Sequence, residues 1–231
     1  MISCLKQKVF VSTRLTGKLE GIAGVTTSCL ECEYCKTMQK SAEKHPEIMK
    51  GSVCTYCYAR KASKRKFKCW ALYKENTANL SEYIPDDELP DLRWNNAGTP
   101  LCRFNTHGEL VNLANLDNYY RIARKNPDFT FALWTKRWDL IRDGALSGIR
   151  PPENLTIVLS SLLLNRPLDD SPVEMLKVHG IHVDTVFTVY TKEYIEEHGV
   201  DINCGGRKCA DCRLCYGHHD ETMYIREELK R

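Results

Sequence analysis

The sequence has no long apolar run and no recognisable export signal. None of its hydrophobic stretches approaches the roughly 18 to 20 residues that cross a membrane. The first ten residues, MISCLKQKVF, also lack an apolar signal core and a small-residue cleavage site. We therefore expect a cytoplasmic protein with no membrane partner.

Cysteine, by contrast, is abundant. The chain has 12 cysteines in 231 residues, whereas its apolar (42%) and charged (27%) fractions are ordinary for a globular protein. In a reducing compartment such cysteines more often bind metals or catalyse than form disulfides. We expect one domain, 1–231, with an N-terminal part (1–85), a middle part (100–200) and a C-terminal tail (201–231).

The middle part predicts an α/β fold with parallel strands. β-branched and aromatic runs alternate there with longer amphipathic stretches, which favours repeated βα units. Strands are expected at 101–105, 129–134, 155–159 and 183–189, with helices near 116–125, 136–146, 172–179 and 192–198. A further strand at 20–27 and a long helix at 58–80 precede them. We expect a partial or small (β/α) barrel, with a doubly wound open sheet as the alternative.

Polar side chains follow the predicted strands, where parallel α/β folds carry their chemistry. We assign cofactor binding to Asn105, Lys136, Arg137 and Ser160. The alternative for the uncharged residues is helix capping. Lys136 and Arg137 precede a predicted helix, and a positive charge at a helix N-terminus is unfavourable because it opposes the helix dipole. Anion binding would explain their presence there, and ordinary surface charge is the alternative.

The first cysteine group follows the strand at 20–27. Two C-x2-C pairs give the pattern C-x2-C-x18-C-x2-C, which has the spacing of a four-cysteine zinc site. An iron–sulfur cluster uses the same thiolate ligands, so the identity of the metal stays open. With a fifth cysteine just upstream, the group comprises Cys29, Cys32, Cys35, Cys54 and Cys57.

The second cysteine group lies near the end of the chain. Four cysteines there form a continuous C-x4-C-x2-C-x2-C run, Cys204, Cys209, Cys212 and Cys215. Ferredoxins use C-x4-C-x2-C and C-x2-C-x2-C spacings, whereas zinc usually takes two separated pairs. The run therefore favours an iron–sulfur centre, and a small structural metal staple is the alternative. We expect metal-binding segments at both ends of the fold.

Several short motifs resemble the gene product eighty-eight family of phage and mobile-element proteins. The resemblance rests on CTYCYARK (54–61), RFN (103–105) with Gly108-Glu109, FALWTKR (131–137) and PENL (152–155). It covers about residues 15–165 and the terminal cysteine run. If the chain is phage-encoded, its compartment is the cytoplasm of the host cell.

That family is in turn similar to the radical S-adenosylmethionine barrel. The similarity implies a [4Fe–4S] cluster held by C-x3-C-x2-C after the first strand, with one iron left open for S-adenosylmethionine. Cys54 and Cys57 match the last two cysteines, but Lys50 stands in place of the first. The third ligand would then come from Cys29, Cys32 or Cys35. The chain also lacks the glycine-glycine-glutamate segment that often contacts the methionine amino group.

A basic run at 60–68 suggests a nucleic-acid partner. It holds six basic residues in nine, with aromatic residues alongside, and Lys64, Arg65 and Lys66 lie at its centre. Release of counterions from phosphates would favour docking of such a run on DNA or RNA. A solvated helix face is the alternative interpretation.

These patterns together predict an iron–sulfur protein with one or two [4Fe–4S] clusters. We expect redox or radical chemistry, with S-adenosylmethionine as a candidate cofactor and an electron donor as a partner. The sequence does not identify the substrate, which could be a small molecule or a macromolecule, and whether the protein is an enzyme stays open. The alternative function is a zinc- or cluster-stabilised binding protein, with nucleic acid as its partner.

Overall fold

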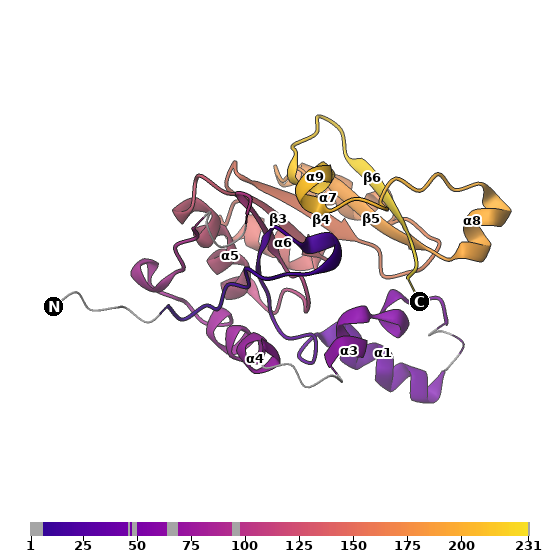
Figure 1. Ribbon diagram of the computed structural model, residues 1–231, viewed down its shortest axis with the longest axis horizontal. Coiled ribbons are helices and arrows are strands. Elements are labelled where there is room, and N and C mark those ends of the chain that lie inside the picture. The colour runs from indigo at the N-terminus through magenta and orange to yellow at the C-terminus, as the bar shows by residue number, and fades with distance from the viewer. Residues whose placement is uncertain (1–6, 46, 48–49, 64–68, 94–97, 231) are drawn as a thin grey trace.

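Six parallel strands form one sheet at the centre of the molecule (Figure 1). The computed structural model describes residues 7–45, 47, 50–63, 69–93 and 98–230. The strands follow one another across the sheet in chain order. They are β1 (Ala23–Val25), β2 (Leu101–Phe104), β3 (Thr130–Thr135), β4 (Leu155–Ser160), β5 (Thr185–Tyr190) and β6 (Met223–Glu228).

This sequential order decides between the two predicted architectures. In a doubly wound sheet the strand order reverses at a switch point. Here each strand pairs with its successor, from Ala23 opposite Cys102 at one edge to Thr185 opposite Met223 at the other. The two edge strands do not pair with each other, so the sheet is open. The doubly wound alternative is wrong in its strand order, and a closed small barrel is wrong because the edge strands do not meet. The fold is α/β with an open parallel sheet.

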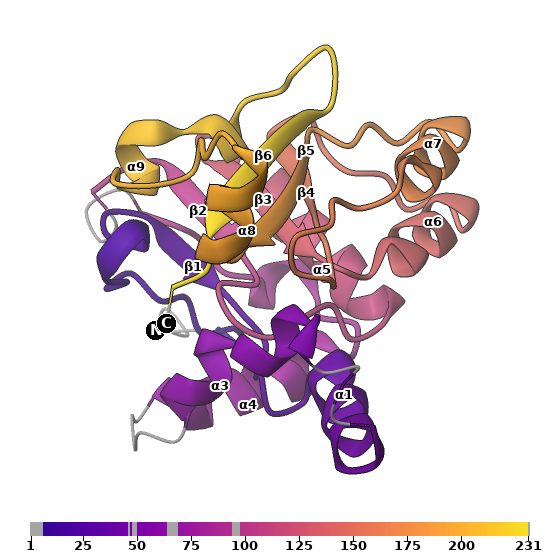
Figure 2. The same ribbon diagram turned by 90° about the vertical axis from the view of Figure 1, so that its right-hand side faces the viewer.

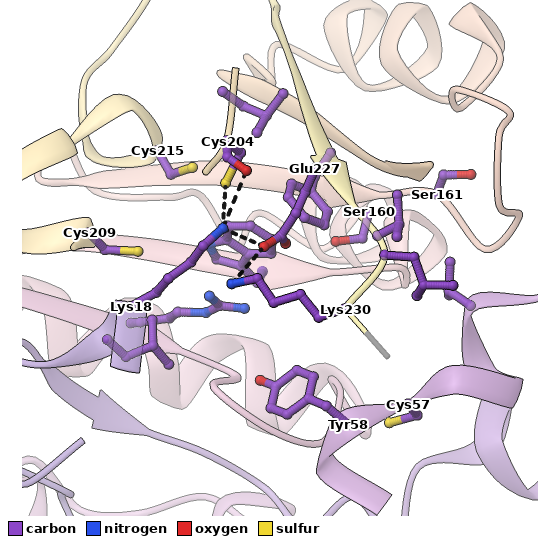
Figure 3. Close-up of a pocket in the computed structure, with 18 of the residues that line it drawn as sticks. Lys18, Cys57, Tyr58, Ser160, Ser161, Cys204, Cys209, Cys215, Glu227 and Lys230 are labelled. Carbon is purple, nitrogen blue, oxygen red and sulfur yellow. Dashed lines mark hydrogen bonds and ion pairs between the residues drawn. The ribbon is translucent and has the colours of Figure 1, made fainter. Parts of the chain in front are cut away.

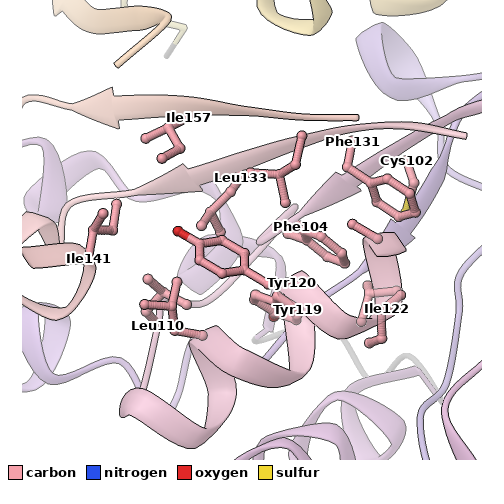
Figure 4. Close-up of a cluster of buried hydrophobic side chains, with 14 of the residues drawn as sticks. Cys102, Phe104, Leu110, Tyr119, Tyr120, Ile122, Phe131, Leu133, Ile141 and Ile157 are labelled. Atoms are coloured by element: carbon pink, nitrogen blue, oxygen red, sulfur yellow. The ribbon is translucent and has the colours of Figure 1, made fainter. Parts of the chain in front are cut away.

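One face of the sheet carries the main hydrophobic core (Figure 4). Alternate residues of a strand point to opposite faces, and Phe104 and Phe131 both point to this one, with ring centroids 5.0 Å apart. Tyr119 stacks on Phe104 at 4.3 Å. The helices that cover this face are α4 (Cys69–Leu80), α5 (Leu113–Lys125), α6 (Trp138–Leu146) and α7 (Asp170–Val178).

We call the opposite face the inner face. It carries a smaller apolar cluster that includes Leu101, Ala132 and Val158. The C-terminal segment packs on it through α9 (Cys209–Cys212) and η5 (Leu214–Tyr216). Figure 2 shows α9 on one side of the sheet and α6 and α7 on the other. Because the helices between strands cover only one face, the inner face is left to the two ends of the chain.

A helical insert lies beyond the carboxyl end of β1 (Figure 2). Its elements are α1 (Glu33–Lys44), η2 (Val53–Tyr56) and α3 (Tyr58–Ser63). Two further single turns, η1 (Gly17–Leu19) and η3 (Asp86–Glu88), precede β1 and β2. Within the described residues, no helix is long and apolar enough to span a membrane.

Most of the predicted elements are present. The helix after β5, α8 (Lys192–His198), has the predicted bounds, and the Thr191 side chain caps it by accepting a hydrogen bond from the Tyr194 amide. The strand expected at 20–27 is shorter, since only Ala23–Val25 pair with β2. Within the helix expected at 58–80, the structure describes α3 and α4, and residues 64–68 between them lie outside the described residues.

The strand β6 was missed because its sequence is polar. It lies at the edge of the sheet, and of its six residues only Ile225 is buried. An edge strand with one buried side chain has almost no hydrophobic alternation, so its sequence, MYIREE, does not distinguish it from a polar tail. Pairing with β5 from Met223 to Glu228 brings this tail over the inner face.

A histidine clasp ties the same tail to the amino ends of the strands. Asp184 directly precedes β5 and is buried, and its Oδ2 accepts the Ile157 amide at 2.8 Å. The His218 ring contacts Asp184 Oδ1 through Nδ1 at 2.8 Å and the Glu153 carbonyl through Nε2 at 2.7 Å. Both partners are acceptors, so the ring donates from both nitrogens when it is protonated.

We expect this clasp to weaken as pH rises. Burial opposes the charge of His218, but the Glu153 carbonyl and the Asp184 carboxylate outweigh it and raise the pKa of the imidazole. A raised folded-state pKa stabilises the fold fully below the unfolded value of about 6.5, and the gain is lost as pH passes the folded pKa. His218→Ala should therefore cost about 0.5 kcal/mol more at pH 5.5 than at pH 8.5, a small effect because the ring is partly exposed. Urea unfolding of both proteins measures this, and an equal cost at the two pH values would contradict it.

Candidate functional site

A single cavity of about 470 Å³ opens on the inner face, and both cysteine groups line it. The first we call the N-terminal cysteine group: Cys29, Cys32, Cys35, Cys54 and Cys57. The second is the C-terminal cysteine group: Cys204, Cys209, Cys212 and Cys215. Figure 3 shows Cys57 across the cavity from Cys204, Cys209 and Cys215. The two groups, which lie about 150 residues apart in sequence, therefore face one another.

Three short elements position the N-terminal cysteine group. Cys29 follows β1 through a buried turn, Cys32 is the N-cap of α1, and Cys35 lies in the first turn of that helix. Cys54 lies in η2, where the Ser52 side chain accepts a hydrogen bond from the Cys54 amide at 3.1 Å. These turns bring residues from both ends of the insert to the same wall of the cavity.

One of these thiols, Cys35, interacts with three others. The Cys35 thiol shares side-chain hydrogen bonds with Cys32, Cys54 and Cys57, and these bonds raise its pKa. The hydrogen bond with Cys35 and, to a smaller extent, the Lys136 charge lower the pKa of Cys54 to about 7 and that of Cys57 to about 6, against the opposing effect of burial. Burial, in contrast, raises the pKa of Cys29 to about 11. Cys32, Cys54 and Cys57 are thus the readiest to become thiolates.

A buried carboxylate holds Lys136 beside these thiols. Glu109 is only 4% exposed, and its Oε2 accepts the Lys136 amide at 2.9 Å and lies 4.0 Å from the Lys136 ammonium. Glu109 Oε1 accepts the Leu110 amide at 2.9 Å and the Thr135 hydroxyl. Burial opposes the charge of Lys136, but Glu109 and the nearby cysteines raise the pKa of its ammonium. The cation is therefore fixed next to the thiols and favours their ionised form.

The C-terminal cysteine group sits against a second cation, Lys18. The Lys18 ammonium contacts Cys204 Sγ at 3.4 Å and also the Glu227 carboxylate, as Figure 3 shows. Burial opposes its charge, but Glu227 and Cys204 outweigh burial and raise the pKa of Lys18. On the thiol side, burial raises the pKa of Cys215 to about 12. The Cys215 carbonyl accepts the Thr156 hydroxyl of β4 at 2.7 Å, which fixes this segment on the sheet.

The floor of the cavity is formed by inner-face side chains of the strands. Arg103 of β2 lies over the Trp134 ring of β3, with its guanidinium carbon 3.8 Å from the ring centroid. The Trp134 and Phe187 rings meet edge to face at 4.6 Å. Ser160, at the end of β4, also lines the cavity. The floor thus combines aromatic surface with one strongly basic group.

The predicted cofactor-binding residues fall into two pairs. Lys136 and Ser160 line the cavity. Asn105 uses its side chain internally, donating to the Trp134 carbonyl at 3.0 Å and accepting from the Tyr119 hydroxyl at 2.9 Å. Arg137 pairs with Asp139 at 2.7 Å, and neither Asn105 nor Arg137 lines the cavity. Lys64, Arg65 and Lys66 lie outside the described residues.

The described residues contain no ready-made metal site. No three histidine, cysteine, aspartate or glutamate side chains among them are placed to hold a metal ion as they stand. The metal-binding segments therefore remain a prediction, although an all-sulfur donor set fits zinc or an iron–sulfur cluster.

Sequence reasoning missed three charged residues of the site, Lys18, Arg103 and Glu227. Lys18 and Glu227 precede and follow the predicted elements, and nothing in the spacing of residues 186 positions apart indicates that Lys18 meets Cys204. Arg103 did leave a signal, because a charged residue at 103 interrupts an otherwise apolar strand. An arginine there requires a polar or ligand-filled surface on one face of the sheet.

Comparison with known proteins identifies the family. The family model Gene product 88 matches residues 13–218, which is most of the 231-residue chain. The match includes both cysteine groups and extends beyond the motifs that carried the resemblance. No curated protein and no solved structure matches the chain. The chain belongs to the Gene product 88 family.

Proposed function

We propose that this member of the Gene product 88 family is an iron–sulfur protein whose cluster forms one wall of a substrate cavity. The observation that supports it best is the contact of the Cys35 thiol with Cys32, Cys54 and Cys57 at that cavity. Sulfur is a soft donor, so a set of four cysteines suits a soft metal centre. A [4Fe–4S] cluster, when bound there, supplies one-electron transfer.

The residues of this chain have separable tasks in the proposal. Cys32, Cys35, Cys54 and Cys57 would hold the cluster, and the Lys136 ammonium balances part of their negative charge. The C-terminal cysteine group would hold a second centre on the opposite wall, with Lys18 as its cation. The aromatic floor keeps water away from the space between the two groups and orients a substrate there.

A finer version of the proposal is radical chemistry with S-adenosylmethionine. An open sheet of sequentially ordered parallel strands, with cysteines directly after β1, is what a partial barrel of that type would require. The version also requires one iron without a protein ligand, so only three thiols would bind, two of them those of Cys54 and Cys57. Lys50 in place of the first motif cysteine makes Cys29, Cys32 or Cys35 the third ligand.

The alternative is a zinc-stabilised binding protein without catalysis. Two C-x2-C pairs whose sulfurs are already in contact suit tetrahedral zinc equally well. In that case the cavity would bind a ligand without transforming it. Nucleic acid remains a proposed partner through the basic run at 60–68, whose last five residues, 64–68, lie outside the described part of the chain.

Anaerobic purification and metal analysis separate these functions. An iron–sulfur protein should be brown and carry about four irons and four sulfides per cluster, that is about four or eight of each per chain. Colourless protein with stoichiometric zinc and no sulfide would overturn the proposal in favour of the alternative. If iron is present, the reduced protein is mixed with S-adenosylmethionine. An unchanged electron-spin-resonance signal without cleavage then eliminates the radical version and leaves electron transfer.

A further inference from the structure

The guanidinium of Arg103 lies in the cavity without an acceptor. It stacks on Trp134, and its Nε is buried with no hydrogen-bond partner in the described part of the chain. Buried N–H groups are nearly always paired, and a charged one is especially costly to leave unpaired. An acceptor that is not part of the described chain would remove this cost.

The other cations of the cavity are already satisfied. Lys18 and Lys230 both pair with Glu227, and Lys136 pairs with Glu109. Arg213 donates to the Ala210 carbonyl, while Arg207 is exposed to solvent. Glu228 is the remaining carboxylate of the described lining, and it forms no hydrogen bond or ion pair with Arg103 there. Among the described residues of this lining, Arg103 is therefore the half-buried cation that has capacity for a further anion.

The surroundings of Arg103 are mainly apolar. The Trp134 and Phe187 rings and the side chain of Val189 line the floor, and Leu19 lines the wall nearby. Such a surface favours the apolar body of a ligand, and a guanidinium favours a planar pair of oxygens. The stacked indole also holds the guanidinium plane in place, which lowers the entropy lost on binding.

We propose that the cavity binds a small amphipathic anion, whose carboxylate or phosphate pairs with Arg103 and whose apolar body packs on Trp134 and Phe187. This inference rests on the proposed function, because it names the class of substrate that the proposed substrate cavity would bind. It needs no metal, because Arg103 and the aromatic floor belong to the sheet itself.

A competing role for Arg103 is that of a counter-charge to the C-terminal cysteine group. Its positive charge acts on Cys209 and Cys215. In that role its loss would weaken metal uptake by those cysteines and would leave anion binding unchanged. The two roles therefore predict different results for the same variant.

Calorimetric titration tests the inference with three probes of similar size: benzoate, phenyl phosphate and neutral benzyl alcohol. The reduced, metal-free protein and the iron-loaded protein are both titrated. We expect at least one anion to bind ten times or more tightly than the alcohol, and Arg103→Met to weaken it at least tenfold. The control Arg207→Met, a cation of the same lining that is exposed, should change affinity less than twofold. Tighter binding of benzoate indicates a carboxylate substrate, and tighter binding of phenyl phosphate a phosphate ester.

Three results would overturn the inference: no anion binding to the wild type, alcohol binding as tight as anion binding, or unchanged affinity in Arg103→Met. If circular dichroism shows that Arg103→Met does not fold, Arg103→Lys replaces it, with a smaller loss because lysine lacks the planar fork; unchanged affinity overturns the inference there too. Protein that takes up no iron but binds the anion through Arg103 would refute only the iron–sulfur proposal. Protein with iron and no anion binding would refute only this inference.

Discussion

Cys35→Ser is expected to abolish cluster binding by the N-terminal cysteine group. Cys35 is the thiol that contacts three others, so its loss removes one ligand and the contacts that hold the remaining three together. Serine keeps the size of the side chain but is a hard oxygen donor and a poor ligand for a cluster. After anaerobic reconstitution, the variant should carry about four fewer irons and four fewer sulfides per chain than the wild type. The absorbance of the protein near 400 nm should fall in proportion, by about half if both groups hold a cluster.

The matched control is Cys69→Ser. Cys69 is also a free cysteine, but it is half-buried where Cys35 is buried, begins α4 and does not line the cavity. Its replacement should leave the iron and sulfide content unchanged. Equal iron content in Cys35→Ser and the wild type would exclude Cys35 as a ligand. An equal loss in both variants would show that the effect comes from general instability and not from ligation.

Gly108→Ala should be among the most destabilising single substitutions in the protein. Gly108 has φ +68°, a conformation that favours glycine, and a Cβ there would lie 2.5 Å from the Thr27 carbonyl oxygen and still closer to Thr27 Oγ1. Thr27 cannot move easily, because its hydroxyl accepts the Glu109 amide at 3.0 Å and donates to the Glu109 carbonyl at 2.8 Å. We expect a loss of roughly 3 kcal/mol or more in the free energy of unfolding, from backbone strain and overpacking together.

Gly148→Ala separates strain from crowding. Gly148 also has a positive φ, +81°, but a Cβ there would have nothing within 4 Å. Its replacement should cost only the backbone strain, about 1 kcal/mol. Urea unfolding of the two variants gives the difference directly. Similar losses of unfolding free energy at the two positions would mean that the backbone around Gly108 and Thr27 shifts easily. The close contact between these two residues would then not be rigid.

The rigidity of the contact between Gly108 and Thr27 affects the proposed cluster site. Thr27 lies just before the first cysteines, and Glu109 holds Lys136 beside them. A shift at Gly108 would therefore move both the loop that carries Cys29 and the carboxylate that positions Lys136. We expect Gly108→Ala, if it folds, to bind less iron than Gly148→Ala, which gives the same pair of variants a functional measurement.

Local patterns predicted most of the fold. The strands β2 to β5 and the helices after them were located within a few residues, because burial imposes a period of two on strands and of 3.6 on helices. The edge strand β6 could not be predicted, because it buries only Ile225 and its sequence therefore has no alternation of apolar and polar residues. Of the helix predicted at 58–80, α3 and α4 are described, and residues 64–68 between them lie outside the described residues.

The repeated βα order and the two cysteine groups can be recognised in the amino-acid sequence, since spacing and periodicity are properties of neighbouring residues. The open sheet with strands in chain order, and the single cavity that both groups face, become visible only in the folded chain. The same holds for Arg103, which has no acceptor for its Nε among the described residues, and for Asn105 and Arg137, which bond to other residues of the chain. Such facts depend on contacts between distant segments, as between Lys18 and Cys204. Whether such contacts form depends on how the whole chain packs, and a local sequence pattern does not predict it.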